Sequence, residues 1–214
     1  MIPKDNLPIL AILRGITEKD VIPLAKLLVR NQIRHVEITM NTDDADRLIQ
    51  QFRIAGKADL NVGAGTVLNM QDLRRALDAG AEFIVCPSLI KDVIAGCVSK
   101  NIPVFPGALT PTEIHTAWKL GATMVKLFPA SLFGPGYIRA VKAPMNNIKL
   151  MAVGGVNPQN ISKFFESGAD AVAFGAGIIR SKWLEEGKYD LIEKHLRMLI
   201  EAYKSNQNHP GIFT

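Results

Sequence analysis

The sequence predicts an α/β fold, a single (β/α)8 TIM barrel, on three observations. Short apolar runs alternate along the chain with amphipathic stretches, which is typical of parallel strands joined by crossover helices. About eight such units occur within 214 residues, and this count favours a closed barrel over an open doubly wound sheet, the alternative architecture. No linker or low-complexity segment interrupts the chain, so we expect residues 1–214 to form one domain.

A repeated local pattern marks the strands, because an amphipathic stretch, a glycine and a short apolar run follow one another three times. Glycine suits the position just after a helix, and the apolar run then indicates a buried strand. In chain order the predicted strands are 9–13, 36–40, 60–64, 81–85, 101–105, 122–126, 148–153 and 169–173. Pro103 weakens the fifth strand, since proline is unusual inside a central strand.

Amphipathic patterns fill the gaps between these strands and predict the helices. They cover residues 18–31, 43–56, 70–79, 89–99, 111–120, 158–167 and 189–205. Two helix starts carry sequence signals: Thr17 is a plausible N-cap, and Thr110 precedes a proline at the first helical position.

Composition narrows the class of protein. The net charge of +5 and the pI near 9.2 raise the question of nucleic acid, but the basic residues are dispersed singly, so we expect a solvated exterior and no nucleic-acid partner. No run reaches the ~18 apolar residues of a membrane helix, and no signal peptide precedes a chain with two cysteines, Cys86 and Cys97. We therefore expect a reduced, cytoplasmic protein without a membrane partner.

Metal ligation is not predicted. The four histidines show no ligand spacing, and no carboxylate cluster suggests a bound cation. They are His35, His115, His195 and His209.

Lys126 is the first candidate catalytic residue, because it lies within an apolar run. The sister units place Val85 and Ala173 at the same position, five residues after the glycine. Strands of a parallel barrel are covered on both faces, so an ammonium group there is desolvated and the neutral amine is favoured. Such an amine can attack a carbonyl carbon and form a Schiff base. The alternative is a lysine that reaches the barrel mouth or pairs with a carboxylate.

Glu37 is the second candidate. Its strand alternates two sets of side chains, with His35, Glu37 and Thr39 on one side and Val36, Ile38 and Met40 on the other. If the apolar set faces the helices, the carboxylate of Glu37 lies inside the barrel, where a raised pKa suits general acid–base catalysis. The alternative is a buried glutamate neutralised by Lys126 or Arg14. Imine chemistry needs an amine and a proton shuttle in one pocket, so Lys126 and Glu37 together indicate a Schiff-base enzyme more specifically than either residue alone.

Two glycine-rich turns follow the seventh and eighth strands. They contain Gly154 and Gly155 in the first, and Gly175, Ala176 and Gly177 in the second. Barrels often bind phosphate at these loops through backbone N–H groups, and glycine lets the backbone approach the anion. The alternative is two tight turns with no ligand.

Further polar and aromatic residues lie late in predicted strands. Arg14 can clamp a substrate carboxylate through its planar guanidinium, Thr66 offers a hydroxyl, and Phe128 with Pro129 can form a wall near the lysine. The alternatives are a rim charge, a helix cap and core packing, respectively.

These motifs resemble those of the 2-keto-3-deoxy-6-phosphogluconate / 4-hydroxy-2-oxoglutarate aldolase family. The resemblance runs from Ile9 to about Tyr203. It rests on V-E-I-T at 36–39, G-A-G-T-V-L at 63–68, F-I-V-C-P at 83–87, K-L-F-P-A at 126–130 and G-G-V at 154–156. It implies a class I Schiff-base aldolase on a (β/α)8 barrel, usually a homotrimer, that requires no cofactor.

The resemblance also implies roles for individual residues. Lys126 corresponds to the lysine that forms the imine with pyruvate, and Glu37 corresponds to the acid/base. Thr66, Pro87 and Phe128 correspond to residues that line the pyruvate site.

The chain departs from the gluconate-type pattern at three positions. Asn41 stands where an arginine often holds the substrate carboxylate, Val153 where threonine often precedes Gly-Gly, and Ala176 where serine is common in the last phosphate loop. The first two departures resemble the 2-dehydro-3-deoxy-6-phosphogalactonate branch, which shares the Ala-Ile-Leu-Arg-Gly opening and the Phe-Gly-Pro at 133–135. Arg14 is then expected to replace the missing clamp, and backbone N–H groups alone to hold the phosphate.

The predicted reaction is reversible retro-aldol cleavage of a 2-keto-3-deoxy-6-phospho sugar acid to pyruvate and glyceraldehyde 3-phosphate. The epimer at C4 stays open at this point. Alternatives are a 4-hydroxy-2-oxoglutarate aldolase, a phosphate-binding barrel isomerase or synthase that uses no imine, and a catalytically silent protein that binds a phosphorylated keto acid.

Overall fold

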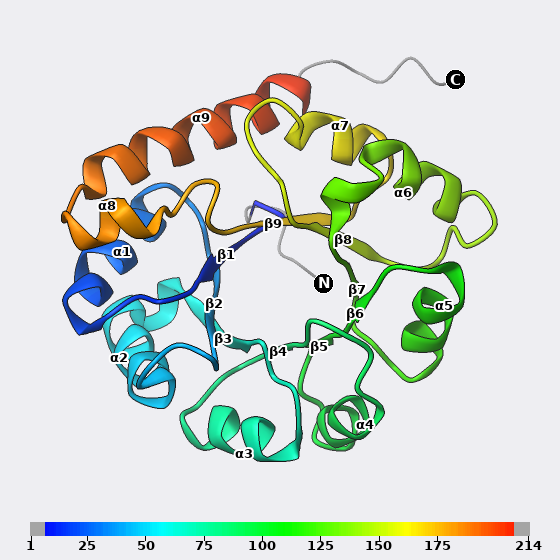
Figure 1. Cartoon of the computed structure of the whole chain (residues 1–214), viewed down its shortest axis with the longest axis horizontal. Coiled ribbons are helices and arrows are strands. Elements are labelled where there is room, and N and C mark those ends of the chain that lie inside the picture. Colours follow the sequence, from blue (N-terminus) through cyan, green and yellow to red (C-terminus); the bar gives the residue numbers. More distant parts are fainter. Residues whose placement is uncertain (1–6, 208–214) are drawn as a thin grey trace.

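A ring of parallel strands forms the centre of the protein, as the computed structural model of residues 7–207 shows (Figure 1). The nine strands are β1 (Ile9–Leu13), β2 (His35–Thr39), β3 (Asn61–Gly65), β4 (Ile84–Val85), β5 (Val104–Phe105), β6 (Gly107–Ala108), β7 (Val125–Leu127), β8 (Leu150–Val153) and β9 (Ala171–Phe174). Their order is β5-β4-β3-β2-β1-β9-β8-β7-β6, with every pair parallel.

The ring closes through β5 and β6, which are two halves of one barrel position interrupted at Pro106. The first half pairs with β4, and the second half pairs with β7. The predicted (β/α)8 barrel is therefore confirmed over the described residues. Pro103 ends the segment before β5, so the proline lies outside the paired residues, as its missing N–H requires.

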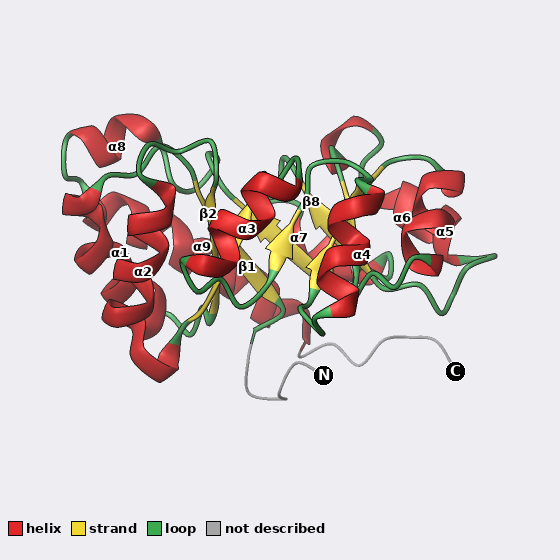
Figure 2. Ribbon diagram, turned by 90° about the horizontal axis from the view of Figure 1, so that it is seen from below, coloured by secondary structure: helices red, strands yellow, loops and turns green. Residues whose placement is uncertain are grey.

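Helices surround the ring on its outer side (Figure 2). The α-helices are α1 (Glu18–Arg30), α2 (Ala45–Gly56), α3 (Met70–Asp78), α4 (Lys91–Ser99), α5 (Pro111–Lys119), α6 (Pro135–Lys142), α7 (Ile161–Glu166), α8 (Ser181–Glu185) and α9 (Tyr189–Gln207). Two 3-10 turns, η1 (Lys57–Asp59) and η2 (Ala130–Leu132), complete the elements.

Two of these helices, α6 and α8, were not predicted. Pro135 and Gly136 open α6, and this pair is a turn signal that hides a helix start. α8 has five residues, too few for a helical period to show. The helix predicted at 158–167 is shorter than expected, because the segment before α7 forms a turn in which the Asn157 N–H donates to Asn160 Oδ1 at 2.9 Å.

The predicted helix starts at Thr17 and Thr110 are confirmed. The Thr17 N–H donates to Asp20 Oδ2 at 2.7 Å, and the Thr110 N–H donates to Glu113 Oε2 at 2.8 Å. Both reciprocal arrangements satisfy N–H groups that have no partner within the helix.

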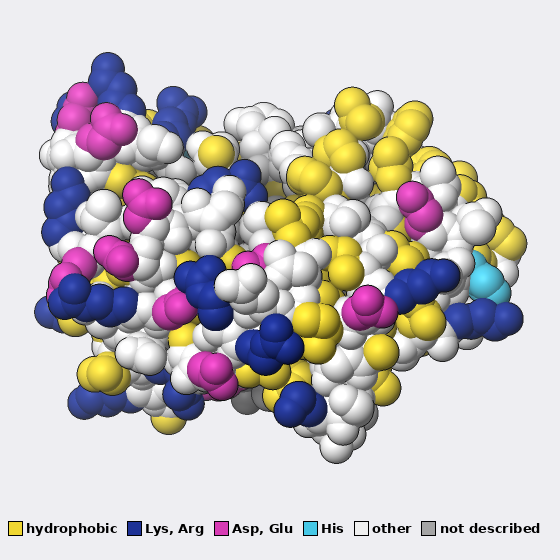
Figure 3. Space-filling model, turned by 60° about the horizontal axis from the view of Figure 1, so that its bottom comes forward, with side chains coloured by type: hydrophobic (Ala, Val, Ile, Leu, Met, Phe, Trp, Pro, Cys, Tyr) yellow, Lys and Arg dark blue, Asp and Glu magenta, His cyan; other side chains and the backbone are white. Residues whose placement is uncertain are grey.

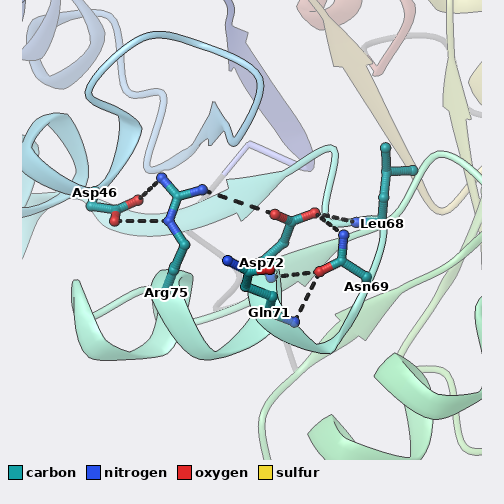
Figure 4. Close-up of polar contacts among 6 residues, drawn as sticks. All are labelled: Asp46, Leu68, Asn69, Gln71, Asp72 and Arg75. Carbon is teal, nitrogen blue, oxygen red and sulfur yellow. Dashed lines mark hydrogen bonds and ion pairs between the residues drawn. The ribbon is translucent and has the colours of Figure 1, made fainter.

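Asn69 caps α3, as Figure 4 shows. Its Oδ1 accepts from the N–H groups of Gln71 and Asp72, each at 2.9 Å. Arg75 then joins α3 to α2 through Asp46 at 2.9 Å. The helix-cap alternative for Thr66 is therefore wrong, and its hydroxyl is available for other contacts.

Side chains of the strands divide into two apolar layers. Val36, Ile38, Val125 and Leu127 face outward and pack with the helices in the larger core. A second, smaller cluster lies inside the barrel, and it comprises Leu10, Phe83, Val85, Met124, Met151, Val153, Ala171 and Ala173 with Ile12 and Phe105. Val36 and Ile38 pack outward while Glu37 is buried on the other side of β2, so the predicted alternation of β2 is confirmed. Met124 lies in the interior cluster on the same side of its strand as Lys126, and Met151 is the partner of Lys126 on β8.

A pocket of roughly 400 Å³ opens at the amino-terminal ends of the strands. Its floor includes Phe83 and Met151, and its rim includes His35 and Lys149. Among the helices of the described residues, none is long and apolar enough to cross a membrane.

The packing of the barrel interior requires glycine at position 63. A Cβ added at Gly63 would overlap the buried ring of Phe83. We expect Gly63→Ala to lower the free energy of unfolding by about 1–3 kcal/mol, as overpacked cores do. Urea denaturation measures this loss.

Gly136→Ala is the matched control, because a Cβ there meets no atom within 4 Å and the residue lies in α6. It should leave stability unchanged or raise it by about 0.5–1 kcal/mol. Equal stabilities for the two variants would contradict the packing argument.

Candidate active site

Lys126 and Glu37 face each other across the inside of the barrel. Their strands, β7 and β2, lie four positions apart in the eight-position ring, counted in either direction, and so stand opposite one another. Both side chains are buried, with exposed fractions of 1% for Glu37 and 6% for Lys126. The alternative that Lys126 reaches the barrel mouth is therefore wrong.

Burial governs the charge of Glu37. It raises the pKa of the carboxyl group, while the positive charges of Lys126 and Arg14 lower it with smaller effect. These charges oppose the effect of desolvation on the pKa without overcoming it. Oε2 of Glu37 is buried and makes no hydrogen bond among the described residues. The group is thus poised to hold a proton or to bind a polar ligand.

Gly65 creates the space that Glu37 occupies. A Cβ at this position would overlap Oε1 of Glu37. Gly65 lies on β3, directly beside β2, at the level of Thr39. The two glycines of β3 therefore leave space for two different side chains: Gly63 for the ring of Phe83, and Gly65 for the carboxylate of Glu37.

Lys126 has an aromatic neighbour and no carboxylate partner. Its Nζ lies 5.1 Å from the centroid of the Phe128 ring. None of the ion pairs in the described part of the chain involves this lysine, so the paired-lysine alternative is not seen. Phe128 is 39% exposed, which makes it a wall of the site rather than core.

Cys86, at the end of β4, lies within the electrostatic reach of both residues. Burial raises the pKa of its thiol to about 12, and the charges of Lys126 and Glu37 also act on it. The thiol is therefore protonated and inert at neutral pH. Cys86 directly precedes Pro87, whose backbone carbonyl packs against Gly107 of β6, so the predicted pyruvate-site residue Pro87 lies at this end of the barrel.

Arg14 and Thr66 lie together at the carboxyl ends of β1 and β3. The guanidinium of Arg14 donates to Thr66 Oγ1 at 3.4 Å, and Arg14 is exposed. Asn41 is exposed just beyond β2, whereas Val153 is buried at the end of β8. The structure thus brings Arg14 and Thr66 into contact and leaves Asn41 on the rim.

Sequence reasoning missed two buried hydroxyls beside Arg14. Oγ1 of Thr42 accepts from the Gly15 N–H at 3.0 Å and lies 2.9 Å from Oγ1 of Thr39. No spacing rule reveals such a contact, because Gly15 and Thr42 belong to different loops.

The two glycine-rich turns lie next to each other at the same end. Gly177 of the second turn packs near the carbonyl oxygen of Val156, which follows the first. Within residues 7–207, the backbone N–H groups of Gly154, Gly155 and Ala176 donate no hydrogen bond. Such unpaired amides in exposed turns suit an anion.

Ser131 of η2 is a further residue that the sequence did not indicate. A Cβ at Gly155 would lie 2.7 Å from Cβ of Ser131 and 3.5 Å from its hydroxyl oxygen. Ser131 is exposed and so places a hydroxyl beside the first turn.

The pocket at the amino-terminal ends of the strands is not this site. It contains His35, one interior layer away from Glu37 on the same face of β2, but neither Lys126 nor Glu37, Arg14 or Thr66. Burial lowers the pKa of His35, so the ring is neutral at neutral pH. In the part of the chain that the structure covers, no three His, Cys, Asp or Glu side chains gather to hold a metal ion. His209 lies outside the described residues.

Known proteins resemble the chain in sequence and in structure. The model of the family "KDPG and KHG aldolase" matches residues 4–195. The 2-dehydro-3-deoxy-6-phosphogalactonate aldolase of Escherichia coli strain K12 is 35% identical over 177 residues, covering 82% of this chain and 86% of that protein. The 2-dehydro-3-deoxy-phosphogluconate aldolase of Treponema pallidum is 30% identical over 175 residues, covering 81% and 83%.

A solved structure described as native KDPGal superposes with a TM-score of 0.90 at 30% identity, covering 98% of this chain and 100% of that one. Sequence and fold therefore agree along nearly the whole described barrel. The chain belongs to the KDPG and KHG aldolase family and is an aldolase, a carbon–carbon lyase.

Proposed function

We propose that this protein is a class I aldolase that cleaves a 2-keto-3-deoxy-6-phospho sugar acid to pyruvate and glyceraldehyde 3-phosphate. The observation that carries the proposal is the placement of Lys126 opposite Glu37 in an apolar barrel interior. An amine and a proton-transfer group in one water-poor site are what Schiff-base chemistry needs. Family membership and the relatives' substrates support the same reaction.

Lys126 starts the reaction by attacking the C2 ketone with its Nζ, which forms a carbinolamine. Glu37, whose pKa is raised by burial, gives a proton to the departing hydroxyl through a water, and a protonated imine results. The Glu37 carboxylate then removes the proton of the C4 hydroxyl. The C3–C4 bond breaks, its electron pair moves into the imine to form an enamine, and the aldehyde leaves. Protonation of the enamine at C3 and hydrolysis release pyruvate and regenerate the amine.

Residues around this pair hold the substrate. Arg14 and Thr66, which contact each other, bind its carboxylate, and Asn41 lies on the rim beside them. Pro87 and Phe128 line the pyruvate portion. The amides of Gly154, Gly155, Gly175 and Ala176 bind the phosphate, and the hydroxyl of Ser131 lies beside Gly155.

The galactonate-derived epimer is the preferred substrate in this proposal. Val153 presents an apolar, buried side chain at the end of β8, where it cannot hydrogen-bond a sugar hydroxyl. The relative from Escherichia coli strain K12, which is a phosphogalactonate aldolase by name, supports this assignment. 4-Hydroxy-2-oxoglutarate is a second candidate substrate, because Ala176 offers the phosphate no side-chain hydroxyl.

We further propose a cytoplasmic homotrimer in which residues 1–214 form one domain. Large apolar side chains are exposed in loops at the carboxyl end of the barrel, and apolar atoms gather along the upper right of the face in Figure 3. These exposed residues include Leu68, Phe128, Leu132 and Phe133. Apolar surface of this kind favours contact between subunits. Both cysteines are buried and free, which suits a reducing compartment.

Trapping of the imine tests the reaction class. Incubation with pyruvate and borohydride should give a reduced adduct on Lys126, which peptide mass spectrometry locates. Lys126→Arg should abolish the adduct and lower kcat by at least about a thousandfold, because it removes the nucleophile. Lys149→Arg is the control, since Lys149 lies at the opposite end of the barrel. A wild-type protein that turns over without an adduct would point to the isomerase or synthase alternative, and a protein without turnover to a silent binding protein.

The raised pKa of Glu37 predicts a pH dependence of stability. A carboxyl group with a higher pKa in the folded state binds more protons there than when unfolded, so its contribution to stability falls as pH rises above the ordinary value of 4.5. Glu37→Gln removes this loss. We expect the unfolding free energy of the variant to rise relative to that of the wild type as the pH is raised from about 4 to about 8. Urea titrations at both pH values measure the difference, and a constant difference would refute the shift.

Substrate preference is tested by comparing the two phospho sugar acids side by side. We expect kcat/KM for the galactonate-derived acid to exceed that for the gluconate-derived acid by about tenfold or more, a ratio of about 1.4 kcal/mol. Val153→Thr should narrow the ratio, because the hydroxyl can then bond the other epimer. Equal values for both acids in the wild type would remove the assignment while leaving the reaction class untouched.

A further inference from the structure

We infer that Thr42 is a positioning residue for Arg14, since its hydroxyl fixes the backbone of the β1–α1 loop so that the guanidinium stays at the substrate carboxylate. This inference rests on the proposed function, in which Arg14 binds that carboxylate. Thr42 itself touches no reacting atom in the proposal and acts through its neighbour.

The contact that ties the loop is a partly buried hydrogen bond. Oγ1 of Thr42 accepts from the N–H of Gly15 at 3.0 Å, and Gly15 directly follows Arg14. Thr42 is 6% exposed, so water cannot readily replace the hydroxyl. Removal of the Thr42 hydroxyl would leave the Gly15 N–H without this hydrogen bond.

Thr42 is in turn held by the strand that carries Glu37. Its Oγ1 lies 2.9 Å from Oγ1 of Thr39, and its N–H donates to the Thr39 carbonyl at 2.9 Å. Thr39 is fully buried and is two residues beyond Glu37 on the same face of β2. The loop of Arg14 is therefore fixed relative to the acid/base strand and not only to its own.

Core packing holds the residues on either side, because Leu13 and Ile16 are buried, but it does not hold Arg14 and Gly15 themselves. Gly15 has a φ of +64°, and a Cβ built there would meet no atom within 4 Å. The side chain of Arg14 is exposed, and its bond to Thr66 is long at 3.4 Å. Two hydrogen bonds thus hold Arg14 in place, one at its guanidinium and one at the Gly15 N–H. The bond at the Gly15 N–H is the shorter and the more shielded from water.

Substitution of Thr42 separates this role from simple packing. Thr42→Val keeps the shape of the side chain and removes the acceptor, whereas Thr42→Ser keeps the hydroxyl. Thr116→Val is the matched control, because the Thr116 hydroxyl is half-buried and bonds only the Thr112 carbonyl within α5, at 2.7 Å.

A double-mutant cycle with Arg14→Ala tests the inference. Steady-state kinetics on the galactonate-derived phospho acid should show that Thr42→Val raises KM about three- to tenfold, the scale of one lost hydrogen bond, with a smaller change in kcat. Thr42→Ser should restore most of the wild-type KM, and Thr116→Val should leave it unchanged. In the Arg14→Ala background the effect of Thr42→Val should shrink to less than about twofold.

An equal rise in KM with and without Arg14 would overturn the inference, because Thr42 would then act through the fold at large. If Thr42→Val does not fold, Thr42→Ala goes through the same cycle. The borohydride adduct is measured for every variant. Absence of the adduct in the wild type is failure of the proposed function, whereas an adduct together with an additive cycle is failure of the positioning role alone. An unchanged KM in Arg14→Ala overturns the clamp and the role of Thr42 with it.

Discussion

The site depends on the burial of a carboxyl group opposite an amine inside a ring of apolar side chains. Taking Glu37 out of water disfavours its charged form more than Lys126 and Arg14 restore it. That balance leaves a carboxyl group able to give and take a proton. It exists only because β3 carries glycine on its inner face, since a side chain at Gly65 would occupy the space of the carboxylate. Absence of a methyl group is thus as necessary as the charged residues themselves.

The same strands serve packing at one end and chemistry at the other. Phe83 and Met151 fill the interior toward the amino-terminal ends, and Gly63 is the concession that lets the Phe83 ring fit. Met124 and Lys126 are two residues apart, so both side chains point into the barrel; Met124 packs in the inner core and Lys126 lies in the active site. The apolar layer below therefore excludes water from beneath the polar pair, which strengthens the electrostatic interactions above it.

Features of the fold and site that depend on neighbouring residues in the sequence could be predicted, whereas contacts between distant segments could not. The alternation within β2 and the position of Lys126 are local, so the sequence predicted that both side chains point inward. The start of α6 is hidden because Pro135 and Gly136 resemble a turn, and Asn69 rather than Thr66 caps α3 because only the three-dimensional loop decides which side chain reaches the free N–H groups. Thr42 and Ser131 contact loops far away in the chain, and no periodicity encodes such contacts.

The departures from the gluconate-type pattern have a connected physical reading. Asn41 lies just beyond β2, at the position where the gluconate-type pattern often has an arginine, and the proposed carboxylate clamp is instead Arg14, in the loop after the neighbouring strand β1. A guanidinium on a loop contributes to binding only if the loop is ordered beforehand, since ordering it on binding costs conformational entropy. The buried hydroxyls of Thr39, on β2, and of Thr42, in the loop after β2, supply that order. The end of β2 and the loop after it therefore help to determine where the positive charge of Arg14 lies.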